Sequence, residues 1–199
     1  MKLNEILYRE IAIDFLNNKN KFTQKELSVR LGISLGNINK AVSNLQSINA
    51  VKIEKRSFNI IAFDKLLLYW ATHRKLDKDI IYRSVSDLKV SEIENTMPNG
   101  IAFTAYTAYK KIYNTAPADY SEVFVYAVPD AVSIIKKRFQ KQGKFPNIIV
   151  LNADKILSKR IINEKINAVP IPNLFVDLWN IRTWYAKEFI DALSKNIFS

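Results

Sequence analysis

The segment that most constrains the fold is residues 19–48, which carries two helix starts separated by a very short turn. At the first start, Thr23 stands three residues before Glu26, the spacing of a capping box, in which two side chains satisfy free backbone amides. The predicted helix ends at Gly32, and Ser34 follows in a position to cap the next helix. The turn Gly32-Ile33-Ser34 is three residues long and contains a glycine, which is typical of a helix-turn-helix.

The second of these helices has one apolar face and one polar face. Helical spacing buries its apolar residues, which are Ile38, Ala41, Val42, Leu45 and Ile48. The opposite face consists of small and hydrogen-bonding residues, namely Gly36, Asn37, Asn39, Lys40, Ser43 and Asn44. A helix that only needs solvation is usually covered by Glu and Lys. Because Asn can pair with adenine and Lys can reach guanine or phosphate, this face predicts a helix that enters the DNA major groove.

A short β-hairpin is predicted directly after this helix. Apolar and polar residues alternate on both sides of Lys55-Arg56-Ser57. A hairpin with a basic tip at this place is a wing, so we expect Lys52, Lys55 and Arg56 to contact backbone phosphates. Such contacts position a protein on DNA without reading its sequence.

From residue 19 to residue 63 the chain resembles the winged helix-turn-helix regulators of bacteria and archaea. The resemblance rests on the pattern T-x-x-E-L-(x)3-L-G-I-S-(x)3-I-(x)3-V-x-x-L and the basic hairpin that follows it. It implies sequence-specific binding of double-stranded DNA by the residues singled out above, which are Gly36, Asn37, Asn39, Lys40, Ser43, Asn44, Lys52, Lys55 and Arg56. Winged helices also serve protein contacts alone, so an adaptor that docks a partner protein is the alternative.

The charge of the chain favours a polyanionic partner. The net charge is +11 and the pI is near 9.7, and residues 1–75 hold 13 basic and 6 acidic side chains. An anionic membrane surface would require a basic amphipathic helix with a Trp/Phe/Leu face, which we do not find. The sequence has no cysteine, no signal peptide pattern and no apolar run near the ~20 residues of a membrane span. We therefore expect a cytoplasmic protein with no membrane partner.

The rest of the chain alternates between helical and extended patterns. A helix capped by Asp64 ends the first domain, which is predicted to span residues 1–75. Helices are expected at about 101–113, 129–142, 154–161, from Asn173 and at 182–197, and strands at 121–128 and 145–153. The prediction is an α+β fold, with an N-terminal winged helix-turn-helix domain followed by a mixed α/β domain at 76–199.

No group of residues in the sequence indicates catalysis. Glycine-rich phosphate loops and a G-x-S-x-G elbow are absent, and His73 has no carboxylate or nucleophile beside it in the sequence. One histidine without any cysteine does not supply a usual metal site. Asp177 lies between bulky apolar residues, and we expect it to form a buried hydrogen bond or salt bridge. We therefore predict no enzyme activity, no catalytic residue, no metal and no cofactor; an enzyme acting on nucleotides or nucleic acids is a further alternative.

A second resemblance covers about residues 19–193. The segments GIAFTAYTAY, VFVYAVP, PNIIVL and AVPIPNLFVDLW, in this order after a winged module, resemble the AbiEi-type antitoxins of type IV toxin–antitoxin pairs. The resemblance implies an autoregulating repressor that binds its operator, and a nucleotidyltransferase toxin as partner. Two copies, as a homodimer, would then occupy an inverted repeat. Residues expected to extend a basic surface into the C-terminal domain are Lys136, Lys137, Arg138 and Lys141, for which a solvated charged face is the equal alternative.

Overall fold

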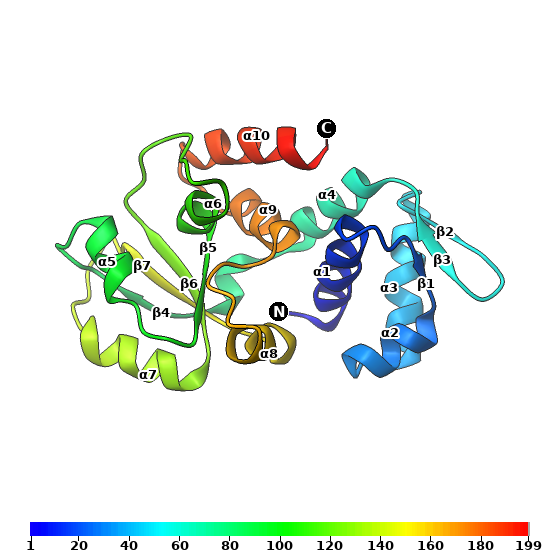
Figure 1. Cartoon of the computed structure of the whole chain (residues 1–199), viewed down its shortest axis with the longest axis horizontal. Helices are drawn as coiled ribbons and strands as arrows, with labels where there is room; N and C mark the ends of the chain where they lie inside the picture. The colour runs from blue at the N-terminus through cyan, green and yellow to red at the C-terminus, as the bar shows by residue number, and fades with distance from the viewer. Residues whose placement is uncertain (199) are drawn as a thin grey trace. The chain divides into compact units, whose positions relative to one another are not determined.

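The computed structural model describes residues 1–198, and the chain divides into two compact units, Met1–Arg74 and a second unit from Lys75 onward (Figure 1). The first unit contains α1 (Leu3–Leu16), β1 (Lys21–Phe22), α2 (Gln24–Leu31), α3 (Leu35–Ser47), β2 (Val51–Ile53), β3 (Phe58–Ile60) and α4 (Phe63–His73). The second unit begins with a 3-10 turn, Leu76–Asp79, and then alternates strands and helices. The predicted α+β fold class is confirmed, with a small sheet in each unit.

Local side-chain chemistry sets the limits of α2 and α3. The Thr23 hydroxyl accepts a hydrogen bond from the backbone N–H of Glu26 at 3.1 Å, and the Ser34 hydroxyl accepts one from that of Asn37 at 3.4 Å. Between the two helices, Gly32 adopts φ 64°, a left-handed conformation that ends α2 at little steric cost. The expected short turn between two helices is therefore present. The other hydrogen bond of the predicted capping box, from the Thr23 backbone N–H to the Glu26 carboxylate, is replaced by an ion pair of Glu26 with Lys19.

The core of the first unit lies where α1, α2, α3 and α4 meet the sheet. Phe22 of β1 and Phe58 of β3 are fully buried and stack with ring centroids 5.4 Å apart. Strand β3 is central, because β1 and β2 both pair with it in antiparallel orientation. The sequence did not predict β1, since two residues are too short to show an alternating pattern.

One sequence prediction for this unit is wrong in detail. The N-cap of α4 is Ala62, whose methyl side chain cannot accept a hydrogen bond from the backbone, and Asp64 lies in the first turn of the helix and does not cap it. His73 is exposed at the end of α4, with its Nδ1 2.8 Å from the carbonyl oxygen of Tyr69.

The second unit is built on a four-stranded sheet of order β4-β7-β6-β5. Its elements are β4 (Ile80–Ser84), α5 (Val90–Thr96), β5 (Ile101–Thr104), α6 (Ala105–Tyr113), β6 (Val123–Ala127), α7 (Pro129–Arg138), β7 (Ile148–Asn152), α8 (Lys155–Asn163), α9 (Ile171–Trp179) and α10 (Ala186–Ile197). Strands β6 and β7 run parallel, joined through α7, whereas β4 and β5 are antiparallel to their neighbours. Helices α6, α9 and α10 pack on one another, and α6 and α9 contact β5 (Figure 1).

The prediction of one helix over residues 101–113 is wrong. The first four form strand β5, and the helix begins only at Ala105, whose φ of 53° turns the chain sharply out of the sheet. All four strand residues are buried, so the alternation that marks a strand is missing there. The sequence also missed β4 and α5. The predicted strands β6 and β7 are confirmed, whereas α7 ends at Arg138, α9 begins at Ile171 and α10 begins at Ala186, each a few residues from the expected limit.

Candidate nucleic-acid interface

The polar residues singled out on α3 share one face of the helix in the structure. Gly36, Asn37, Asn39, Lys40 and Ser43 are exposed and Asn44 is half-buried. The opposite side, with Ile38, Ala41, Val42 and Leu45, is buried in the core of the unit. The amphipathic prediction for α3 is therefore confirmed, and its polar face is available to a partner.

The two edges of this polar face have different surroundings. The Ser43 hydroxyl donates to Oδ1 of Asn39 at 3.4 Å, and within residues 1–198 the amide N–H groups of Asn39 have no acceptor. On the other edge, Asn37, Lys40 and Asn44 line a hollow of about 300 Å³ together with Leu3 and Asn4. The beginning of α1 thus lies beside α3, a neighbour that the sequence analysis did not anticipate.

Tyr8 holds α1 against α3 at this place. Its hydroxyl donates to the backbone carbonyl of Ala41 at 3.4 Å, and its side chain is fully buried. Burial raises the pKa of the Tyr8 hydroxyl to about 12, since the ionised form would lose its hydration. The tyrosine therefore stays neutral and keeps its proton for this hydrogen bond in the physiological range.

The β2–β3 hairpin presents two cations at its tip. The backbone N–H of Glu54 donates to the carbonyl of Ser57 at 2.8 Å, which closes the turn around Lys55 and Arg56. The Glu54 carboxylate accepts hydrogen bonds from the Ser57 hydroxyl at 3.0 Å and from the Asn59 amide at 3.1 Å. The Glu54 carboxylate is thus hydrogen-bonded to residues of its own hairpin. Both cations at the tip, Lys55 and Arg56, are exposed.

Most acidic groups of the first unit form ion pairs with other residues. Ion pairs join Glu5 to Arg74 at 3.0 Å, Glu10 to Arg9 at 2.9 Å, Asp14 to Arg30 at 2.6 Å, Glu26 to Lys19 at 2.5 Å and Glu54 to Lys21 at 3.7 Å. Within residues 1–198, no ion pair engages the four cations of α3 and the hairpin, which are Lys40, Lys52, Lys55 and Arg56. These four positions consequently carry positive charge that no acidic side chain in residues 1–198 compensates.

Asp177 lies in the core of the second unit. It is fully buried, and its carboxylate accepts hydrogen bonds from the Thr104 hydroxyl at 2.8 Å, the Tyr126 hydroxyl at 3.1 Å and the Asn173 amide at 2.7 Å. These donors join β5, β6 and α9. The expectation of a buried hydrogen bond is confirmed, and the carboxylate fastens the helical layer to the sheet.

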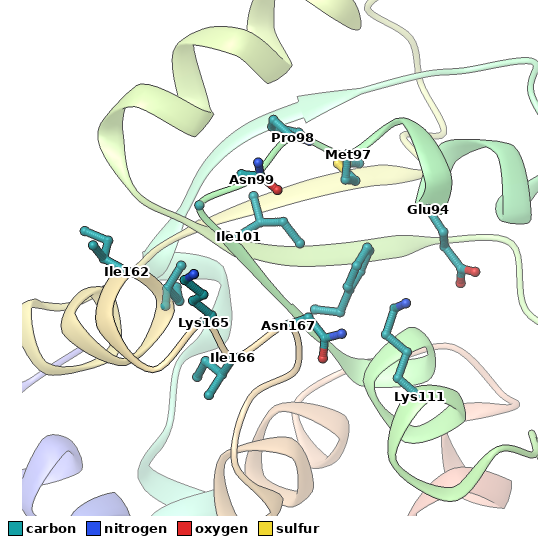
Figure 2. Close-up of a pocket in the computed structure, with 13 residues that line it drawn as sticks. Glu94, Met97, Pro98, Asn99, Ile101, Lys111, Ile162, Lys165, Ile166 and Asn167 are labelled. Atoms are coloured by element: carbon teal, nitrogen blue, oxygen red, sulfur yellow. The ribbon is translucent and has the colours of Figure 1, made fainter.

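A second hollow lies in the C-terminal unit and has a volume of about 670 Å³ (Figure 2). Its walls come from segments far apart in the sequence, so sequence reasoning had no signal for it. The residues are Glu94, Met97, Pro98, Asn99, Gly100, Ile101, Phe103, Lys111, Ile161, Ile162, Lys165, Ile166 and Asn167. Across the part of the chain that the structure describes, no cluster of His, Asp and Glu has the arrangement of a metal site.

Comparison with known proteins gave no match: no protein family, no curated protein and no solved structure matches this chain. Among residues 1–198, no helix is both long enough and apolar enough to pass through a membrane.

Proposed function

We propose that the N-terminal unit is a winged helix-turn-helix module that binds double-stranded DNA. The observation that carries the proposal is that α3 has an exposed polar face and that the exposed cations of α3 and the hairpin, Lys40, Lys52, Lys55 and Arg56, form no ion pair within residues 1–198. Such a surface fits DNA, because phosphates supply the missing counter-charge and base edges supply partners for the asparagine amides.

In this proposal the two parts of the surface have different tasks. Helix α3 enters the major groove, where Asn39, Lys40 and Ser43 meet base edges, and the small residue Gly36 lets the helix approach closely. Lys55 and Arg56 bind backbone phosphates and set affinity and orientation. Phosphate contacts therefore dominate the affinity, and α3 determines the sequence preference.

The protein would act as a transcriptional repressor by occupying an operator. A homodimer on an inverted repeat, with half-sites about one helical turn apart, is the geometry expected for this class of module. The resemblance to AbiEi-type antitoxins adds autoregulation and a nucleotidyltransferase toxin as partner. In this proposal the protein acts in the cytoplasm.

The test is a hydroxyl-radical footprint of the full chain on DNA from its own promoter. The proposal predicts protection of two backbone stretches about one turn apart, centred on an inverted repeat. The variant N39A should keep the backbone protections on random-sequence DNA at higher protein concentration but lose the preference for the promoter. Uniform cleavage at all protein concentrations would refute DNA binding and would favour the alternative, a winged module that docks a partner protein.

A further inference from the structure

We propose that the hollow in the C-terminal unit binds a small phosphate monoester of about mononucleotide size. Its volume of about 670 Å³ lies within the range of small-molecule sites. Four stretches of chain form it: the end of α5 with the following turn, strand β5, helix α6, and the end of α8 with the segment to Asn167. Figure 2 shows the side chains of these stretches around one space, with Lys111 and Lys165 on different sides of it.

The charge available in the hollow is positive. Its one acidic residue, Glu94, is already engaged, because its carboxylate accepts hydrogen bonds from the Thr107 hydroxyl at 2.9 Å and the Tyr120 hydroxyl at 2.7 Å. Lys110, which lies outside the hollow, also pairs with Glu94 at 3.4 Å. Lys111 and Lys165 form no ion pair within residues 1–198. The hollow therefore attracts an anionic ligand.

Two lysines on different sides of the hollow favour a ligand with more than one negative charge over one that carries a single carboxylate. Lysine binds phosphate as a point charge, and a phosphate monoester carries between one and two negative charges near neutral pH. The amides of Asn99 and Asn167 border the same space and offer further donors. The apolar part of a ligand would face the aliphatic side chains Met97, Ile101, Ile162 and Ile166.

The walls that carry these groups are held by main-chain contacts. The backbone N–H of Phe103 donates to the carbonyl of Asn167 at 2.8 Å, which fixes the segment after α8 along the edge of β5. Gly100 has φ 83°, and a Cβ on it would lie 3.0 Å from a methyl carbon of Val128, so the turn before β5 has little room to change. The ammonium of Lys111 lies 4.9 Å from the centre of the Phe103 ring, a cation–π contact that keeps it at the wall. A site of fixed shape reduces the cost of ordering on binding.

The experiment is isothermal titration calorimetry of the full chain with AMP, GMP, CMP and UMP, and with adenosine as the uncharged control. At least one mononucleotide should bind, and adenosine should bind much more weakly. The variant K111Q/K165Q should weaken binding about tenfold or more, because it removes two charge-assisted contacts. The matched control K155Q/K159Q removes the same charge from exposed positions of α8 outside the hollow and should bind as the wild type does.

Two further variants separate this site from the N-terminal surface and from misfolding. K55Q/R56Q, in the other unit, should leave mononucleotide affinity unchanged whether or not the protein binds DNA. I162W fills the hollow from a position that is 59% exposed, so it should abolish binding while thermal unfolding stays near that of the wild type. The proposal is overturned if none of the mononucleotides binds, or if binding survives both K111Q/K165Q and I162W. Equal losses in K155Q/K159Q or K55Q/R56Q would also overturn it.

Discussion

Replacing both cations at the hairpin tip should weaken DNA binding in a way that depends on salt and not on DNA sequence. Lys55 and Arg56 are exposed and belong to no ion pair in the described chain, so the variant K55Q/R56Q removes charge without releasing an acidic partner. Each phosphate contact contributes about 0.9 to the slope of log affinity against log salt concentration. The variant should therefore lower that slope by about 1.8, which is roughly 60-fold in affinity at ~0.1 M salt relative to ~1 M.

The assay is fluorescence anisotropy with labelled promoter and random duplexes over a range of salt concentrations. K155Q/K159Q, which has the same net charge as the test variant, is the control and should reproduce the wild-type slope. Glu54 holds the turn through its own hydrogen bonds, so the tip should keep its shape when its two cations are replaced. An unchanged slope in K55Q/R56Q, or an equal decrease in the control, would refute the assignment of the hairpin to phosphate contacts.

Three further predictions concern α3 and the two cores. N39A should reduce the preference for promoter over random duplex by about 5- to 150-fold, the worth of one good base contact; equal affinity losses on both duplexes in competition titrations would contradict this. D177A should destabilise the second unit by about 3 kcal/mol or more in urea unfolding, because three buried donors lose their acceptor, whereas the exposed-site control D191A should not. Since the pKa of Tyr8 is raised to about 12, its proton is lost more readily on unfolding, and wild-type stability should fall relative to Y8F by about 1 kcal/mol from about pH 9 to about pH 11. A constant difference between wild type and Y8F over this range would exclude that effect.

Elements with local chemical signals at their ends were predictable from the sequence. Thr23, Gly32 and Ser34 act within a few residues of themselves, and each lies at the helix end that its side chain or backbone freedom indicated. The sequence did not predict strand β5, because its conformation is determined by its neighbours in the sheet and not by an alternating apolar and polar pattern of its own. The residue that follows the strand, Ala105, has a positive φ that a non-glycine residue rarely adopts, so its identity did not indicate the turn.

The candidate sites also differ in how far the sequence could predict them. The polar face of α3 follows from helical spacing alone, and its exposure in the structure agrees with the pattern. The neighbouring position of Asn4 and the partners of Asp177 depend on tertiary packing, which spacing does not reveal. The hollow of the C-terminal unit is the extreme case, because the walls that carry Lys111 and Lys165 meet only through the pairing of β5 with the segment after α8.

The most direct test of the central claim is a binding titration of the full chain against DNA from its own promoter, beside a random duplex, at two salt concentrations. The account predicts tight binding that weakens steeply with salt and a clear preference for the promoter. Absent binding, or weak and equal binding to both duplexes, would contradict it and assign the surface of α3 and the hairpin to a protein partner.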